Sequence, residues 1–238
     1  MKKNLMLIGL VISFFLSACV SNQPKTGFDA LPFHQYLDGG SSDTGVILCH
    51  DQGQTANGVI VGSLRKSIHK DLGYHTLSIM MPVKNGSPEK QLANYPEAYR
   101  RIQAAVDVLQ KEKAVDTYYF IGHGVGANMI SGYLKNHINP SVKGFAGMGM
   151  RGFPDGDLNT TQNLGKILSR NTSLKVLDIY GDKGGRFIYL SKDNAHAERR
   201  RGLNSHKGFK QVLVEEANHN FTGKDAELRD LILNWMKD

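Results

Sequence analysis

Residues 121–127 read IGHGVGA, a glycine-rich turn between an apolar segment and the start of a helix. Before the turn, residues 116–121 are rich in aromatic and β-branched side chains, a composition typical of a buried strand. After the turn, residues 128–134 carry apolar side chains at helical spacing. The stretch therefore predicts a buried strand, a sharp turn and a helix in immediate succession.

This succession resembles the nucleophile elbow of the α/β-hydrolase fold, whose pattern is G-x-S-x-G. Gly122 and Gly126 match the small flanking residues, but Gly124 occupies the place of the nucleophilic serine. Glycine has no side chain with which to attack a substrate, and it relieves a backbone strain of about 1–3 kcal/mol at the elbow. The resemblance implies a hydrolase scaffold without its elbow nucleophile. We expect Gly124→Ser to restore some reactivity.

Strand-like and helical runs alternate from Gly45 to the end of the chain. The strand-like runs are residues 46–49, 76–81, 116–121, 142–148, 174–180 and 210–215. Continuous apolar strands that alternate with amphipathic helices predict a mostly parallel sheet covered on both faces. We therefore expect one α/β-hydrolase-like domain over residues 45–238. It has no large lid, because the connection between the fourth and fifth runs is short.

The N-terminus resembles the signal of a bacterial lipoprotein. Two lysines precede an apolar run that is too short to span a membrane, and the run ends in LSAC at residues 16–19. This ending is similar to the lipobox, in which the cysteine becomes the lipidated first residue of the mature chain. We predict a signal peptide over residues 1–18 and membrane attachment through Cys19. An ordinary signal peptide with a chance cysteine is the alternative.

The segment after Cys19, residues 19–44, has little periodicity and is predicted to be a lipidated tether. In the Gram-negative lipoproteins that the signal resembles, Asp after the cysteine favours retention at the inner membrane. Val20 stands there in this chain. The expected location is therefore the bacterial envelope, at the outer membrane facing the periplasm.

Two further parts of a hydrolase site follow from the resemblance. His219 comes after the last strand and matches the family's catalytic base, although a structural histidine is the alternative. The loop after the first strand begins at His50 and matches the oxyanion loop, so the backbone N–H groups of Gln52 and Val125 would be the donors. Asp51 replaces the glycine expected there and adds negative charge, so a turn that binds no anion is the alternative.

The acid that orients the base is predicted to be Asp182, after the strand 174–180. Family members often carry the acid two residues later, where this chain has Gly184. Asp182 could orient His219 or could be a surface turn residue. Ser131 and Cys49 are the remaining candidate nucleophiles, but their positions within the elbow helix and the first strand place them badly.

Composition limits the partners and cofactors. After lipidation of Cys19 one cysteine remains, and no Cys/His cluster has metal-ligand spacing, so we expect no disulfide, no metal and no cofactor. The formal net charge is +7, and residues 186–210 are locally basic around Arg199, Arg200 and Arg201. This basic patch is either a site for anionic lipid or an envelope partner, or a solvated helix face. No nucleic-acid-binding motif is present, and we expect no nucleic acid partner.

Two functions are consistent with these features. The first is a lipid-anchored pseudohydrolase that binds a ligand or an envelope partner without covalent catalysis. The alternative is an active ester or amide hydrolase that uses His219 with a non-standard nucleophile or water. Fold alone does not distinguish them.

Overall fold

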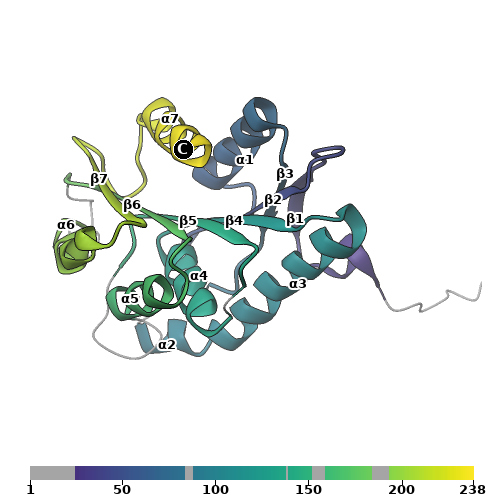
Figure 1. The fold of residues 1–238 in the computed structure, drawn as a ribbon, viewed down its shortest axis with the longest axis horizontal. Helices are drawn as coiled ribbons and strands as arrows, with labels where there is room; N and C mark the ends of the chain where they lie inside the picture. Colours follow the sequence, from purple (N-terminus) through teal and green to yellow (C-terminus); the bar gives the residue numbers. More distant parts are fainter. Residues whose placement is uncertain (1–24, 84–87, 138, 152–158, 184–192) are drawn as a thin grey trace, which may run out of the picture.

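A seven-stranded sheet forms the centre of the molecule, in the order β1-β3-β2-β4-β5-β6-β7 (Figure 1). The computed structural model describes residues 25–83, 88–137, 139–151, 159–183 and 193–238. Strands β2 to β7 are parallel, which confirms the mostly parallel sheet, and β1 is antiparallel to β3. The strands are β1 (His34–Leu37), β2 (Thr44–Cys49), β3 (His75–Ile79), β4 (Thr117–His123), β5 (Val142–Met148), β6 (Lys175–Gly181) and β7 (Phe209–Val214).

Helices cover both faces of the sheet, as the alternating sequence predicts. One face carries α1 and α7, and the other carries α3, α4 and α5 (Figure 1). The helices are α1 (Val59–Leu72), α2 (Pro88–Leu92), α3 (Tyr95–Lys113), α4 (Val125–Asn136), α5 (Thr160–Arg170), α6 (Asp193–Arg200) and α7 (Asp225–Lys237), with short 3₁₀ turns at Gly27–Ala30 and Arg201–Ser205.

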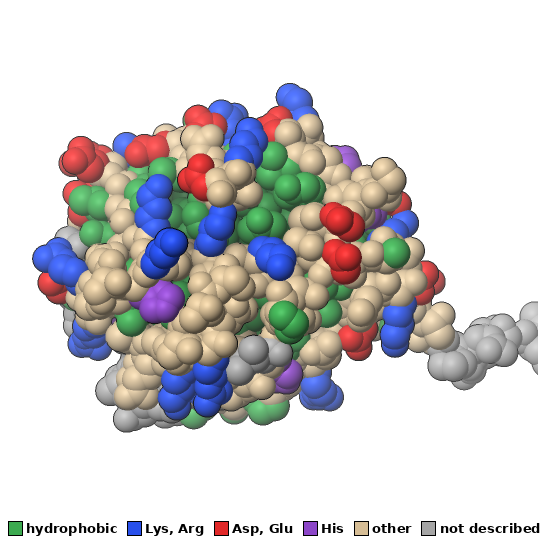
Figure 2. All heavy atoms as spheres, viewed as in Figure 1, with side chains coloured by type: hydrophobic (Ala, Val, Ile, Leu, Met, Phe, Trp, Pro, Cys, Tyr) green, Lys and Arg blue, Asp and Glu red, His purple; other side chains and the backbone are tan. Residues whose placement is uncertain are grey.

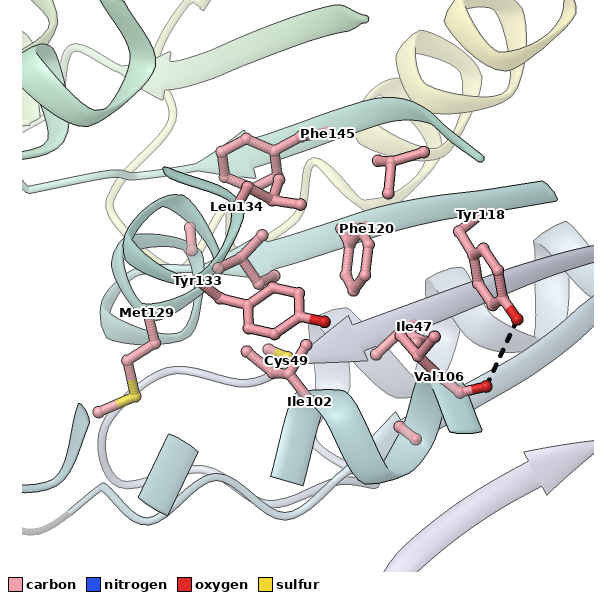
Figure 3. Packing of buried hydrophobic residues seen from close by; sticks show 14 of the residues in the cluster. Ile47, Cys49, Ile102, Val106, Tyr118, Phe120, Met129, Tyr133, Leu134 and Phe145 are labelled. Carbon is pink, nitrogen blue, oxygen red and sulfur yellow. Dashed lines mark hydrogen bonds between the residues drawn. The ribbon is translucent and has the colours of Figure 1, made fainter. Parts of the chain in front are cut away.

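Each face of the sheet has its own hydrophobic core. Side chains of β2 alternate between them, so Ile47 packs under α3 and α4, while Leu48 packs under α1 and α7. Figure 3 shows the first core, in which the ring centroid of Phe120 lies 6.0 Å from that of Tyr133 of α4. Tyr118 can be buried in this core because its hydroxyl donates to the carbonyl of Val115 at 2.9 Å. The carbonyl of Val106 lies 3.4 Å away and shares this hydrogen bond. Burial on both faces explains why the strands read as continuous apolar runs.

The folded part of the chain begins before Gly45. The sequence places residues 19–44 in the tether, but β1 pairs with the edge strand β3 and Leu31 is buried in the first core. An antiparallel edge strand of four residues is too short to show a clear alternating pattern. Cys19 and the signal peptide lie outside the described residues.

Arg200 was predicted to be part of an exposed basic patch, and this prediction is wrong. Arg200 is fully buried, and its guanidinium donates to both carboxylate oxygens of Asp178, at 2.8 and 2.9 Å. Burial is possible because the bidentate ion pair satisfies both groups. Arg199 and Arg201 remain exposed, while Arg186 and Lys192 lie outside the described residues. No helix in the described part of the chain is long and apolar enough to cross a membrane.

Candidate functional site

The predicted elbow joins β4 to α4 at the C-terminal edge of the sheet. Gly124 has φ 51° and ψ −118°, a conformation that side-chain-bearing residues rarely adopt. Close packing explains the glycines two residues before and two residues after Gly124. A Cβ atom on Gly122 would lie 2.7 Å from the nitrogen of Ala127, and one on Gly126 would lie 2.6 Å from the carbonyl oxygen of Cys49. The elbow backbone is therefore retained although the serine is absent.

The side chain of Asp51 fills the space beside Gly124 where a nucleophile would project. A Cβ atom on Gly124 would lie 2.6 Å from Asp51 Oδ2 and would overlap Oδ1. Gly124→Ser alone would therefore drive a side chain into this carboxylate. The geometry therefore opposes the expectation that this single substitution restores reactivity, because the carboxylate of Asp51, from the loop after β2, would have to move first.

Two predicted site groups bind Asp51. The backbone N–H of Val125 donates to Oδ1 at 2.7 Å, and His219 Nε2 lies 2.9 Å from Oδ2. Asp51 and His219 are both almost fully buried, 4% and 3% exposed. The Val125 donor, which would stabilise an oxyanion in a hydrolase, is thus occupied by a carboxylate of the protein itself.

Charge holds Asp51 in its ionised form. Burial by itself would raise the pKa of Asp51, but the hydrogen bond from His219 and the nearby His123, His219 and Arg151 outweigh burial and lower the pKa well below its ordinary value. An ionised carboxylate only accepts hydrogen bonds, so His219 Nε2 carries the shared proton. In the hydrolase mechanism this nitrogen must accept a proton from the nucleophile. Here it already holds one.

Arg151, which sequence reasoning missed, completes the ion cluster. Its Nη2 lies 3.8 Å from Asp51 Oδ2 and 3.4 Å from His219 Nε2. The backbone of Arg151 is fixed by Asn128 of α4, whose side chain accepts from its N–H at 3.1 Å and donates to its C=O at 2.8 Å. The sequence offered one indication that Arg151 belongs to the site. It follows β5 closely, and residues that follow parallel strands meet at one edge of the sheet.

Two buried histidines support the loops of the site. His50 accepts a hydrogen bond from the backbone N–H of Met81 through Nε2, so its Nδ1 donates to the carbonyl of Asp51 at 2.8 Å. Burial lowers the pKa of His50 and favours this neutral form. His123 Nε2 donates to the carbonyl of His219 at 2.9 Å. The loops after β2 and β7 are therefore held by side chains as well as by packing.

The predicted acid does not join the base. Oδ1 of Asp182 accepts from the backbone N–H of Glu216 at 2.8 Å, and no hydrogen bond joins Asp182 to His219 among the described residues. Glu216 has a positive φ of 60°, so Asp182 supports a tight turn after β7. The turn-residue alternative is the better description of Asp182. Gly184 lies outside the described residues.

The remaining predicted residues take different positions. Gln52 lies partly exposed in the loop after Asp51, next to the exposed Gly53. Ser131 is fully buried and its hydroxyl donates to the carbonyl of Asn128 at 2.7 Å, away from the elbow. Cys49 is fully buried in the first core, and burial raises the pKa of its thiol. Neither Ser131 nor Cys49 replaces the missing serine.

Asp51, His123 and His219 have potential ligand atoms within 4.8 Å of one another. The contacts of these residues do not suit a metal ion. Nε2 of His123 donates to a carbonyl, Asp51 accepts from Val125 and His219, and the cationic Arg151 lies beside them. A divalent cation would be repelled by the guanidinium and would have to displace these bonds.

An open groove of about 520 Å³ lies beside the ion cluster. It is bounded by the loops that follow Asp51 and His219, and Gln54 Nε2 donates across it to Asn220 Oδ1 at 3.4 Å. Val59 lines the groove and is 78% exposed, so the groove has an apolar part. The groove offers space for a ligand next to a site whose own polar groups are occupied.

Comparison with known structures places the fold. An alpha-beta serine hydrolase homologue from Coxiella burnetii has a TM-score of 0.61 and 18% identity, covering 84% of this chain and 89% of that chain. A putative alpha/beta hydrolase from Agrobacterium tumefaciens has a TM-score of 0.62 and 19% identity, covering 86% and 89%. A serine hydrolase without a lid from Xanthomonas campestris has a TM-score of 0.59 and 14% identity, covering 88% and 95%.

No protein-family model matches the sequence, and no curated protein matches it. The structural likeness shows that the chain has the α/β-hydrolase fold. The residues that the structure describes contain no large lid. At these identities the likeness concerns the fold and leaves the activity open.

Proposed function

We propose that this protein is a lipid-anchored pseudohydrolase of the bacterial envelope, which binds a ligand or partner without covalent catalysis. The observation that carries the proposal is the position of Asp51, whose carboxylate lies where the serine would project and accepts from the Val125 donor. The proton on His219 Nε2 supports it, because that nitrogen cannot act as a base while it donates to Asp51. The open groove beside the cluster is the proposed binding place.

The second candidate is the hydrolase that uses Asp51 or water in place of serine. The specific observation in its favour is that one oxygen of Asp51 meets the elbow N–H while the other meets the histidine. A carboxylate placed in this way has the neighbours of a nucleophile. Its almost complete burial and its low pKa oppose this role, because both reduce its access to a substrate and its basicity.

Catalysis is tested with a fluorophosphonate probe and a short-chain nitrophenyl ester. We expect no labelling and no turnover by the wild-type protein. Asp51→Gly combined with Gly124→Ser should be labelled, because the first change removes the carboxylate and the second supplies the hydroxyl beside His219. Gly124→Ser alone is the matched control and should stay unlabelled because Asp51 blocks the new side chain.

Two results separate the candidates. Ester turnover by the wild-type protein that is lost in both Asp51→Asn and His219→Gln would overturn the pseudohydrolase and support the second candidate. If the double variant is labelled equally with and without His219, that histidine does not act as a base. The proposal that this chain keeps the rest of a hydrolase site around Gly124 then fails.

The anchor is tested separately by metabolic labelling with a palmitate analogue. Cys19→Ser should abolish the label, since the thiol is the predicted acylation site. Equal labelling of the variant would contradict the anchor without bearing on the pseudohydrolase.

A further inference from the structure

Arg65 of α1 is a buried arginine without a carboxylate partner. Lysine and arginine side chains project into solvent over the face shown in Figure 2, whereas Arg65 is 3% exposed. Arg200, the other arginine that is buried in the described part of the chain, is paired with Asp178. No salt bridge joins Arg65 to a described residue, and its Nε has no hydrogen-bond partner there. Burial lowers the pKa of Arg65, because the charged guanidinium loses its hydration.

The guanidinium of Arg65 binds the side-chain amide of Asn57, just before α1. Nη2 of Arg65 donates to Oδ1 of Asn57 at 3.2 Å. Asn57 is exposed and lines an open hollow of about 420 Å³ beside α1. Water therefore reaches this amide from one side, while its carbonyl oxygen accepts from a buried positive charge on the other.

The residue after Asn57 is glycine. Asparagine followed by glycine is prone to deamidation, because glycine has no side chain to keep its backbone nitrogen away from the asparagine amide. The pair occurs at residues 57–58 and again at residues 85–86, and the second pair lies outside the described residues. Asn57 thus combines a reactive dipeptide, access to water and a positive charge at its carbonyl oxygen.

Deamidation at this pair is a balanced exchange of ammonia for water. The backbone nitrogen of Gly58 attacks Cγ of Asn57 and gives up its proton, and the amide nitrogen leaves as ammonia, so that a cyclic succinimide forms. Water then opens the ring at either carbonyl and leaves aspartate or isoaspartate. Negative charge develops on Oδ1 during the attack, and Arg65 already donates to this atom. The hydrogen bond from the Gly58 N–H to the carbonyl of Thr55, 2.8 Å long, must open first.

The surroundings of Asn57 also suit the charged product. Gly58 is the N-cap of α1 and provides no side-chain cap, and the first turn of the helix contains no acidic residue. A carboxylate at residue 57 would lie at the positive end of the helix dipole. It would also supply the opposite charge that the buried guanidinium of Arg65 lacks.

We propose that Asn57 is a site of spontaneous deamidation, that Arg65 accelerates the reaction, and that the carboxylate formed there pairs with Arg65. The change adds a negative charge at the rim of the open groove, because Gly58 and Val59 line that groove. The proposal depends neither on the lipid anchor nor on the absence of catalysis.

The reaction is tested by peptide mapping with mass spectrometry on the purified full chain, aged at mildly alkaline pH. We expect Asn57 to deamidate several-fold more slowly in Arg65→Met than in the wild type, because the variant lacks the donor to Oδ1. Lys70→Gln removes an exposed cation from the last turn of the same helix and should leave the rate unchanged. Asn85 is the internal reference, with the same rate expected in all three proteins. Wild-type protein that keeps Asn57 intact while Asn85 deamidates would overturn the site, and equal rates in Arg65→Met and the wild type would overturn the role of Arg65.

The pairing of the product is tested with Asn57→Asp, which reproduces the aspartate form. This variant should raise the midpoint of urea unfolding, and the gain should disappear in an Arg65→Met background. Asn204→Asp introduces the same charge at an exposed position and should have the same small effect in both backgrounds. A lower midpoint in Asn57→Asp, or an equal gain with and without Arg65, would overturn the ion pair.

Discussion

Asp51 and Asp178 are both buried carboxylates that face arginine, but their partners differ in kind. Asp178 is closed by Arg200 and Gln211, with three hydrogen bonds of 2.8 to 2.9 Å that tie α6 to β6 and β7. Asp51 is held by Val125 and His219, with Arg151 at 3.8 Å. The Asp178 cluster uses Arg200 and Gln211, which are not among the residues of the candidate site. The second uses the groups that a hydrolase leaves open for its substrate.

This difference has a physical consequence. A bidentate pair between full charges stabilises one arrangement strongly and leaves no vacant donor. A carboxylate that binds an elbow N–H and a histidine also closes the reaction site, because the substrate and the carboxylate would compete for the same donors. Substitutions in the Asp178 cluster should therefore lower the free energy of unfolding strongly. Substitutions in the Asp51 cluster should lower it less, but should change the chemistry of the candidate site.

The largest effect is expected from Arg200→Ala. Removing one partner of a buried ion pair leaves an uncompensated charge, so we expect a loss of about 3–5 kcal/mol in the free energy of unfolding, measured by urea titration. The exposed Arg201→Ala should change it by no more than about 0.5 kcal/mol. Similar losses in the two variants would remove the distinction between buried and surface arginines in this segment.

Gly124→Ala should come next. Its positive φ adds about 1–2 kcal/mol of strain, and the displaced Asp51 loses hydrogen bonding worth about 0.5–1.5 kcal/mol net. In an Asp51→Gly background the second contribution should vanish, so the two substitutions should be strongly non-additive in a double-mutant cycle. Simple additivity would mean that Gly124 and Asp51 do not compete for the same space.

Asp51→Asn should cost about 1–3 kcal/mol at neutral pH, because a buried charged acceptor becomes a neutral amide. The pKa of Asp51 is lower in the folded chain than its unfolded value of about 3.9, so the ionised group stabilises the fold above that pH. This stabilisation is lost as the pH falls through the folded-state pKa. Unfolding measured at decreasing pH should therefore show the variant approaching the wild type, and a constant difference would contradict the low pKa.

Asp182→Ala should have the smallest effect, about 0.5–1.5 kcal/mol, since it removes one hydrogen bond to a surface turn. NMR of the imidazole of His219 gives the sharper result. The resonance of Nε2 should be unchanged in Asp182→Asn and should move in Asp51→Asn, because Nε2 loses its carboxylate partner. A comparable change in Asp182→Asn would restore the orienting role first predicted for this residue.

Local patterns determined much of the fold. The six parallel strands, the helices between them and the strained turn at Gly124 follow from apolar periodicity and glycine spacing. The elbow backbone was also predictable, because Gly122 and Gly126 report close packing that only glycine permits. The edge strand β1 was missed, since four residues carry too little periodicity for a prediction.

The candidate site needed the tertiary structure. The sequence alone identified Gly124 as lacking a nucleophile, His219 as a candidate base and Asp51 as an added negative charge. It gave no sign that Asp51 lies in the space left by the serine, that Asp182 supports a turn, or that Arg200 is buried. These facts depend on contacts between loops that are far apart in the chain. Local periodicity reports the environment of each segment, whereas the pairing of charges across a sheet edge is decided only when the strands assemble.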